Sequence, residues 1–140
     1  MAQEEDERKT EGVIRAIEDG ANAVDIGRIE AVMWLDDARF SEIEESVAEP
    51  FGAPTVHEIH TWLRENATPG DNVRYSDLSV HLLAPTVAYA TARQDSSLDG
   101  TTTSWVTFIV LKQGDRWGLI HSHTSLMREA EGAGEEDETA

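Results

Sequence analysis

The sequence predicts an α+β fold in which a curved antiparallel sheet packs against three helices. Apolar side chains recur at helical spacing in the first half of the chain, and the repeat shortens to two residues after residue 72. The apolar stripes of the helices need a partner, and so do the apolar faces of the strands. A sheet that curves around the helices is the compact solution to both requirements.

The first elements are helical. A first helix is expected from about residue 6 to residue 20, with Val13, Ile14 and Ile17 on one side. Asp25 is a good N-cap for a second helix, because its short carboxylate can accept a hydrogen bond from a backbone amide of the first turn. A short strand is expected at 38–43.

The second half of the chain is mostly strand. Thr55 and Glu58 have the spacing of a capping box, which predicts that a third helix begins here and ends near Asn66. Alternation with period two then predicts four long strands, at 73–83, 86–93, 102–112 and 116–126. With one or two short strands, they make the expected antiparallel sheet.

Charge is the unusual feature of the composition. The chain has 28 acidic and 11 basic residues, a formal net charge of −17, and only two of the bases are lysines. An acid-rich, lysine-poor surface is typical of proteins from organisms that keep high salt in the cytoplasm, where repulsion is screened. Ordinary acidic tails on a protein from a low-salt organism are the alternative. Nucleic acid is not an expected partner, because no basic stripe is present to neutralise phosphates.

The organisation expected is one domain at 11–127 between flexible acidic tails at 1–10 and 128–140. No apolar run approaches the roughly 18 residues of a membrane span, so no membrane partner is expected. The absence of cysteine fits a reducing cytoplasm. Since no glycine-rich dinucleotide motif or phosphate loop occurs, no cofactor is predicted.

The last predicted strand contains the strongest functional pattern. Alternation places Trp117, Leu119, His121, His123 and Ser125 on one face of the strand. Two imidazoles and a hydroxyl beside an indole suggest a pocket wall that contacts a ligand or moves a proton. The alternative is that these groups are hydrogen-bonded polar filling. If both histidines lie on the solvent face, the pocket interpretation loses its support and an association module becomes the preferred function.

Other polar residues are candidates for the same pocket. Asp36 and Asp37 precede the short strand, although adjacent carboxylates are also ordinary in turns. The catalytic candidates are His123 and Asp36. The ligand-binding candidates are His121, Tyr75, Trp62, Trp34, Phe40 and Trp117.

A metal site is not predicted. His57 and His60 flank Glu58, but their spacing is i,i+3 rather than the i,i+4 of a His-Glu-x-x-His helix, and no third ligand is evident. A solvated His57 and a half-buried His60 are expected instead.

The third of the four predicted long strands, at 102–112, is apolar on both faces from Trp105 to Leu111. An antiparallel sheet with one face in water should alternate apolar and polar residues. We therefore expect the outer face to be covered, and predict a homodimer through an outer face that includes Val106, Phe108 and Val110.

Residues 105–125 resemble the last hairpin of the nuclear transport factor 2-like superfamily, because they contain a strand, a glycine turn and then the pattern Trp-x-Leu-x-His-x-His-x-Ser. Within that superfamily, the resemblance is nearest to the SnoaL-like and ketosteroid-isomerase-like branch. The segment AVDIGRIEAVMWLDDARFSE is similar to the helix that leads into an acid-containing first strand, and EPFGAPTVHEIHTW resembles the glycine-containing loop before the third helix. The resemblance covers residues 8–127 and implies a cone-shaped sheet around the helices.

The resemblance implies two functions. One is a pocket that binds or transforms a small apolar carbonyl compound, as an isomerase, dehydratase or cyclase does. In ketosteroid isomerases a carboxylate moves the proton while a tyrosine and a protonated acid stabilise the enolate; Tyr75 and Asp77 do not map onto that pair by motif. The alternative is a non-catalytic association module similar to that of the calcium/calmodulin-dependent kinase. The lack of an attached domain to assemble favours the pocket.

Overall fold

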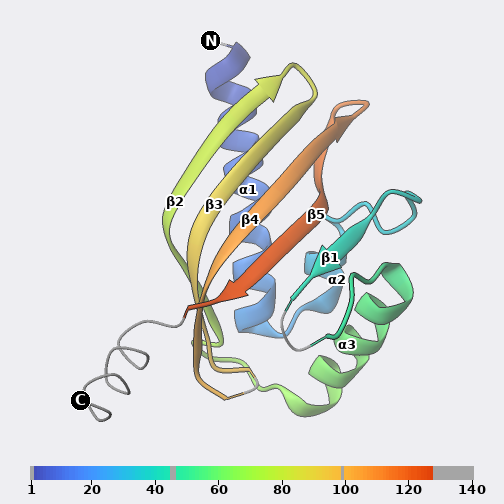
Figure 1. The fold of residues 1–140 in the computed structure, drawn as a ribbon, viewed down its shortest axis with the longest axis vertical. Helices are drawn as coiled ribbons and strands as arrows, with labels where there is room; N and C mark the ends of the chain where they lie inside the picture. The colour runs from blue at the N-terminus through green and yellow to red at the C-terminus, as the bar shows by residue number, and fades with distance from the viewer. Residues whose placement is uncertain (1, 45–46, 99, 128–140) are drawn as a thin grey trace, which may run out of the picture.

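A long helix, α1 (Ala2–Ala23), crosses the concave side of a five-stranded sheet, and a second long helix, α3 (Ala53–Asn66), lies further out beside the sheet's lower end (Figure 1). The computed structural model describes residues 2–44, 47–98 and 100–127. The short helix α2 (Ile26–Glu30) follows α1. The predicted α+β class, a curved sheet packed against three helices, is confirmed.

The sheet is mixed rather than wholly antiparallel. Its strands are β1 (Ser41–Ile43), β2 (Val73–Ala84), β3 (Val87–Ser96), β4 (Thr102–Gln113) and β5 (Arg116–Leu126), in the spatial order β1-β5-β4-β3-β2. The four long strands pair antiparallel through short turns, as expected. The edge strand β1 pairs parallel with β5, which the long connection through α3 and the other strands makes possible.

The helix ends agree with the sequence in one case and differ in others. The Asp25 cap is confirmed, because its side chain accepts a hydrogen bond from the backbone amide of Arg28. Helix α1 includes residues 2–10, which the sequence pattern assigned to an acidic tail. The tail expected at 128–140 lies outside the described residues.

The capping box predicted for the third helix is wrong. Helix α3 begins at Ala53 after Gly52, with no side-chain hydrogen bond at its cap, so Thr55 and Glu58 lie inside the helix. Pro54 explains the earlier start: proline lacks an amide hydrogen, and the first turn of a helix is the place where that donor has no partner anyway.

A β-bulge at Ile120 decides which side chains of β5 face inward. Ile109 of β4 pairs with His121, but the next residue, Val110, pairs with Leu119, so Ile120 is an extra residue on β5. One extra residue reverses the alternation of side chains beyond it. The prediction that Trp117, Leu119, His121, His123 and Ser125 share one face is therefore wrong.

The faces of β4 are also the reverse of the expected ones. Val106, Phe108 and Val110 are buried on the concave side, where they form part of the core. The outward residues are Trp105, Thr107, Ile109 and Leu111, and Trp105 is 50% exposed.

In the described part of the chain, no helix is long and apolar enough to cross a membrane.

Candidate functional site

A cavity of about 690 Å³ lies between the concave face of the sheet and the helices. This volume is in the range of small-molecule sites. Helices α1, α2 and α3 supply an apolar wall that includes Ile17, Ile29 and Leu63. The strands supply most of the polar groups, which are Glu42, Tyr75, Gln94, Ser96, Thr102, Ser104, Ser122 and Thr124, and Glu44 follows the end of β1.

Glu42, on the edge strand β1, is a buried carboxyl of this cavity whose pKa is strongly raised. Its register partner on β5 is Ser122, whose hydroxyl donates a 2.8 Å hydrogen bond to Glu42 Oε2. Burial, opposed by the Ser122 hydrogen bond and assisted by the negative charge of Glu44, raises the pKa of Glu42 to about 7. Near neutral pH, Glu42 can therefore both give and take a proton.

Tyr75 places a hydroxyl in the same cavity. It is 7% exposed and packs edge-on against Phe108, with the ring centroids 5.3 Å apart. The hydrogen bonds that Tyr75 makes within the described residues come from its backbone amide and carbonyl, not from its hydroxyl. Burial raises the pKa of Tyr75, and the charges of Glu42 and Glu18 add to that rise, so the hydroxyl stays protonated and is a hydrogen-bond donor.

Helix α1 holds Tyr75 in position through its backbone. The amide of Tyr75 donates a 2.7 Å hydrogen bond to Glu18, and its carbonyl accepts a 2.9 Å hydrogen bond from Arg15. Arg15 and Glu18 are themselves paired at 3.0 Å. Since β2 is an edge strand, these side chains satisfy backbone groups that would otherwise lack a strand partner.

Helix α3 is tied to α2 at the cavity wall. His60 is buried, lines the cavity, and places Nδ1 2.7 Å from Glu30 Oε2, while His57 Nδ1 lies 3.3 Å from the same oxygen. His57 is exposed. Over the residues that the structure describes, no three His, Asp or Glu side chains are arranged to hold a metal ion.

Of the predicted site residues, Tyr75 and Trp62 line the cavity. His121 and His123 do not, because the bulge at Ile120 directs them to the convex face. His121 is half-buried against Ser41, with Nδ1 2.9 Å from the serine hydroxyl, and His123 is exposed. The sequence argument for a pocket at the histidine strand therefore fails.

The remaining predicted residues have other surroundings. Trp34 lies over Gly118, and its indole donates a 2.8 Å hydrogen bond to the Leu111 carbonyl. Trp117 is buried, with its indole 3.2 Å from Asp6. Phe40 is in the core and Asp36 is exposed, and neither lines the cavity.

Asp37, the neighbour of Asp36, forms a surface pair instead of a site. It accepts hydrogen bonds from the Arg39 guanidinium and backbone amide and from Gln113. These bonds hold the pKa of Asp37 far below its usual range. A carboxylate that is this reluctant to take a proton is a poor general base at neutral pH.

Sequence reasoning missed Glu42 and Ser122. The available signal was an acid inside the short strand, between the core residue Phe40 and the half-buried Ile43. A carboxylate at such a position is costly to bury unless a hydrogen bond or protonation compensates, and Glu42 has access to both.

Comparisons with known proteins agree with this architecture. No family model matches the sequence, and no curated protein matches it. A nuclear transport factor 2-like protein of unknown function from Pseudomonas putida superposes with a TM-score of 0.72 at 20% identity, with 92% of each chain covered. A candidate scytalone dehydratase from Novosphingobium aromaticivorans gives 0.72 at 8% identity, covering 91% of this chain and 87% of that one.

The association domain of calcium/calmodulin-dependent kinase II from C. elegans is also similar. Its TM-score is 0.66 at 14% identity, with 88% of this chain and 97% of that chain covered. The chain therefore has the nuclear transport factor 2-like fold, as the sequence resemblance implied.

Proposed function

We propose that the concave cavity binds a small, largely apolar carbonyl compound and that Glu42 and Tyr75 are its polar contacts. The observation that supports this most is that Tyr75 lines the largely apolar cavity while its hydrogen bonds within the described residues use only its backbone, and that it lies close enough to Glu42 to be affected by its charge. A carbonyl oxygen is the acceptor that such a donor needs. Apolar lining with a few polar groups is typical of small-molecule sites.

The same pair could transform the compound. Glu42 would take a proton from the carbon next to the carbonyl and return it at another carbon, and Tyr75 would donate a hydrogen bond to the oxygen as negative charge develops there. Ser122 orients the Glu42 carboxyl through the 2.8 Å hydrogen bond. An isomerase moves a proton from one carbon to another in this way. If the compound instead loses a hydroxyl group from the neighbouring carbon as water after the proton is removed, the reaction is a dehydration.

Binding and proton transfer can be tested with one probe, 2-acetylnaphthalene. We expect saturable binding by isothermal titration calorimetry, and at least about tenfold weaker binding for Tyr75→Phe, which leaves the carbonyl oxygen without its donor. Glu42→Gln should abolish any protein-dependent exchange of the acetyl protons for deuterium in D₂O. His123→Ala is the matched control, because its imidazole lies on the other face of the sheet.

The outcomes separate the alternatives. Binding without exchange would make the protein a binder rather than an enzyme for this class of compound. No binding of the ketone, or equal binding by the wild type and Tyr75→Phe, would contradict the proposal.

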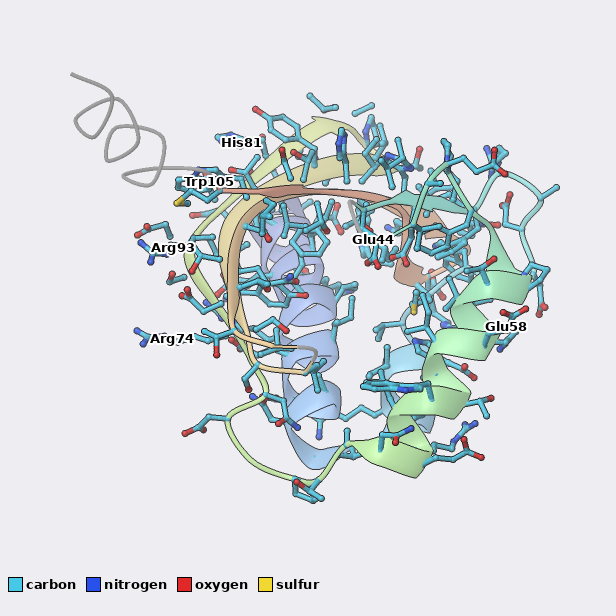
Figure 2. The ribbon with its side chains drawn as sticks, turned by 60° about the horizontal axis from the view of Figure 1, so that its bottom comes forward. Glu44, Glu58, Arg74, His81, Arg93 and Trp105 are labelled. Carbon is cyan, nitrogen blue, oxygen red and sulfur yellow. The ribbon has the colours of Figure 1, made fainter. Side chains whose placement is uncertain are left out.

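The convex face supports a second function, association with another copy of the chain. Figure 2 shows Trp105, Arg93 and His81 on the side of the sheet away from the helices. Trp105 is 50% exposed, and the half-buried Ile109 and Leu111 follow it on the same face. An exposed indole beside aliphatic residues is characteristic of interfaces. The outward position of His121 and His123 also favours this function over a pocket at β5.

A further inference from the structure

Ser104, on β4, is a buried polar residue at the wall of the cavity, with only 3% of its surface exposed. His60 and Ser122 are also buried and polar at this wall, and each is hydrogen-bonded to a carboxylate. Within the described residues, the interactions of Ser104 are instead those of its backbone in the sheet. Because a buried hydroxyl is normally hydrogen-bonded, we expect its partner to come from the contents of the cavity.

Gln94 and Thr124 lie near Ser104 on the same face of the sheet. Gln94 of β3 is the register partner of Ser104, so the Cβ atoms of the two residues are about 5 Å apart. Thr124 of β5 pairs with Val106, two residues along β4, which places it diagonally opposite Ser104 at about 7–8 Å. All three side chains line the cavity, and none of them is ionisable. We call them the neutral cluster, since the amide and the two hydroxyls can each donate and accept hydrogen bonds.

The neutral cluster is separate from the groups proposed to contact the carbonyl. Ser122, which is hydrogen-bonded to Glu42, is the register partner of Phe108. Ser104 and Phe108 are four residues apart on β4, which is about 13 Å along a strand. The ring of Tyr75 packs against Phe108 and its hydroxyl is affected by the charge of Glu42, so that hydroxyl belongs to the Glu42 end of the cavity. The cavity therefore has two polar ends.

We propose that the neutral cluster is a second binding subsite, which recognises a hydroxyl group on the ligand at the end away from its carbonyl. This inference rests on the proposed function. A hydroxyl group donates one hydrogen bond and accepts another, which matches the amide of Gln94 and the hydroxyl of Ser104. An analogue without this group would leave the buried polar side chains of the cluster unpaired, so the cavity selects the hydroxylated compound.

The test compares 2-acetylnaphthalene with 6-hydroxy-2-acetylnaphthalene, which differs only by a hydroxyl at the opposite end of the ring system. In calorimetric titrations of the full chain at pH 7, the hydroxy ketone should bind at least about fivefold more tightly. The 6-methoxy compound can accept a hydrogen bond but cannot donate one, and it should lose this advantage.

Removal of the cluster should remove the selection. The double variant Ser104→Ala, Gln94→Leu should bring the two ketones to within about twofold of each other, mainly by weakening the hydroxy ketone. Tyr75→Phe should weaken both ketones alike and keep their ratio, because Tyr75 contacts the carbonyl end. Thr107→Ala is the matched control: it removes a hydroxyl from the same strand, but from the exposed convex face, and should leave the ratio unchanged.

Three results would overturn the inference. These are equal affinity of the wild type for the two ketones, an unchanged ratio in the double variant, and loss of the ratio in Thr107→Ala or Tyr75→Phe. The first is decisive even if the double variant fails to fold. Binding of 2-acetylnaphthalene together with any of the three leaves the proposed function intact, whereas binding of neither ketone overturns both.

Discussion

His60 Nδ1 lies 2.7 Å from Glu30 Oε2, and this contact joins α3 to α2 at the wall of the cavity. The carboxylate also faces His57 on the next turn toward the start of α3. Burial by itself would raise the pKa of Glu30, but the hydrogen bond with His60 and the electrostatic effects of His60, His57 and Arg64 lower it overall. This carboxylate therefore helps to hold α3, which forms part of the cavity wall, against α2.

Glu30→Gln should lower the free energy of unfolding at pH 7 by about 1–2 kcal/mol, because a charge-assisted hydrogen bond becomes a neutral one. A carboxyl with a lowered folded pKa stabilises the fold above its unfolded pKa of about 4.5, and this contribution is lost as the pH falls through the folded value. The difference between variant and wild type should therefore shrink in acid. Urea unfolding at pH 7 and pH 4 measures it, and a difference independent of pH would contradict the assignment.

Glu42→Gln should remove a pH dependence of stability with the opposite sign. Because the folded pKa of Glu42 is raised to about 7, its contribution is fully present below the unfolded value of about 4.5 and is lost as the pH rises through 7. Relative to the variant, the wild type should lose up to about 3 kcal/mol between pH 4 and pH 8. Parallel urea titrations of both proteins across this range test the sign, and equal slopes would refute it.

Trp105→Ser should weaken self-association. The wild type is expected to sediment at about twice the 15.5 kDa chain mass, and the variant at or near the single-chain mass, because the indole is the largest exposed apolar group of the convex face. Trp62→Ser is the control: its indole is 44% exposed but lines the cavity instead. A monomeric wild type at both low and high salt would rule out the dimer.

Salt should stabilise the fold. A net charge of −17 on a small chain repels itself most when screening is weak, and the Debye length grows to about 30 Å at 0.01 M salt. We expect the melting temperature to rise as potassium chloride increases from tens of millimolar to molar. A flat or falling curve would mean that the acidic residues do not strain the folded state.

Gly118→Ala should destabilise the protein by about 1–3 kcal/mol, as overpacking does elsewhere. A Cβ atom at this position would lie 2.7 Å from the Trp34 indole nitrogen and would displace the ring from its hydrogen bond to Leu111. Gly12→Ala is the comparison, since nothing lies within 4 Å of the new Cβ and the residue is inside α1. That change should stabilise the helix by about 0.5–1 kcal/mol. Thermal melts of the two variants should move in opposite directions.

The sequence by itself determined the elements and the fold class. Helical and two-residue repeats depend on side chains close together in the chain, so they located α1, α2 and the four long strands to within a few residues, and Asp25 marked a helix start correctly. The start of α3 was missed because Pro54 permits a helix to begin without the side-chain cap that Thr55 and Glu58 suggested.

Only the tertiary structure decided which side chains meet in the cavity. The bulge at Ile120 is a property of the pairing between β4 and β5, invisible in the alternation of either strand, and it turned His121 and His123 outward while bringing Ser122 inward. The parallel pairing of β1 with β5 then placed Glu42 beside Ser122, 80 residues away in sequence. Contacts between strands so distant in the chain depend on register and curvature, which a periodic pattern does not encode.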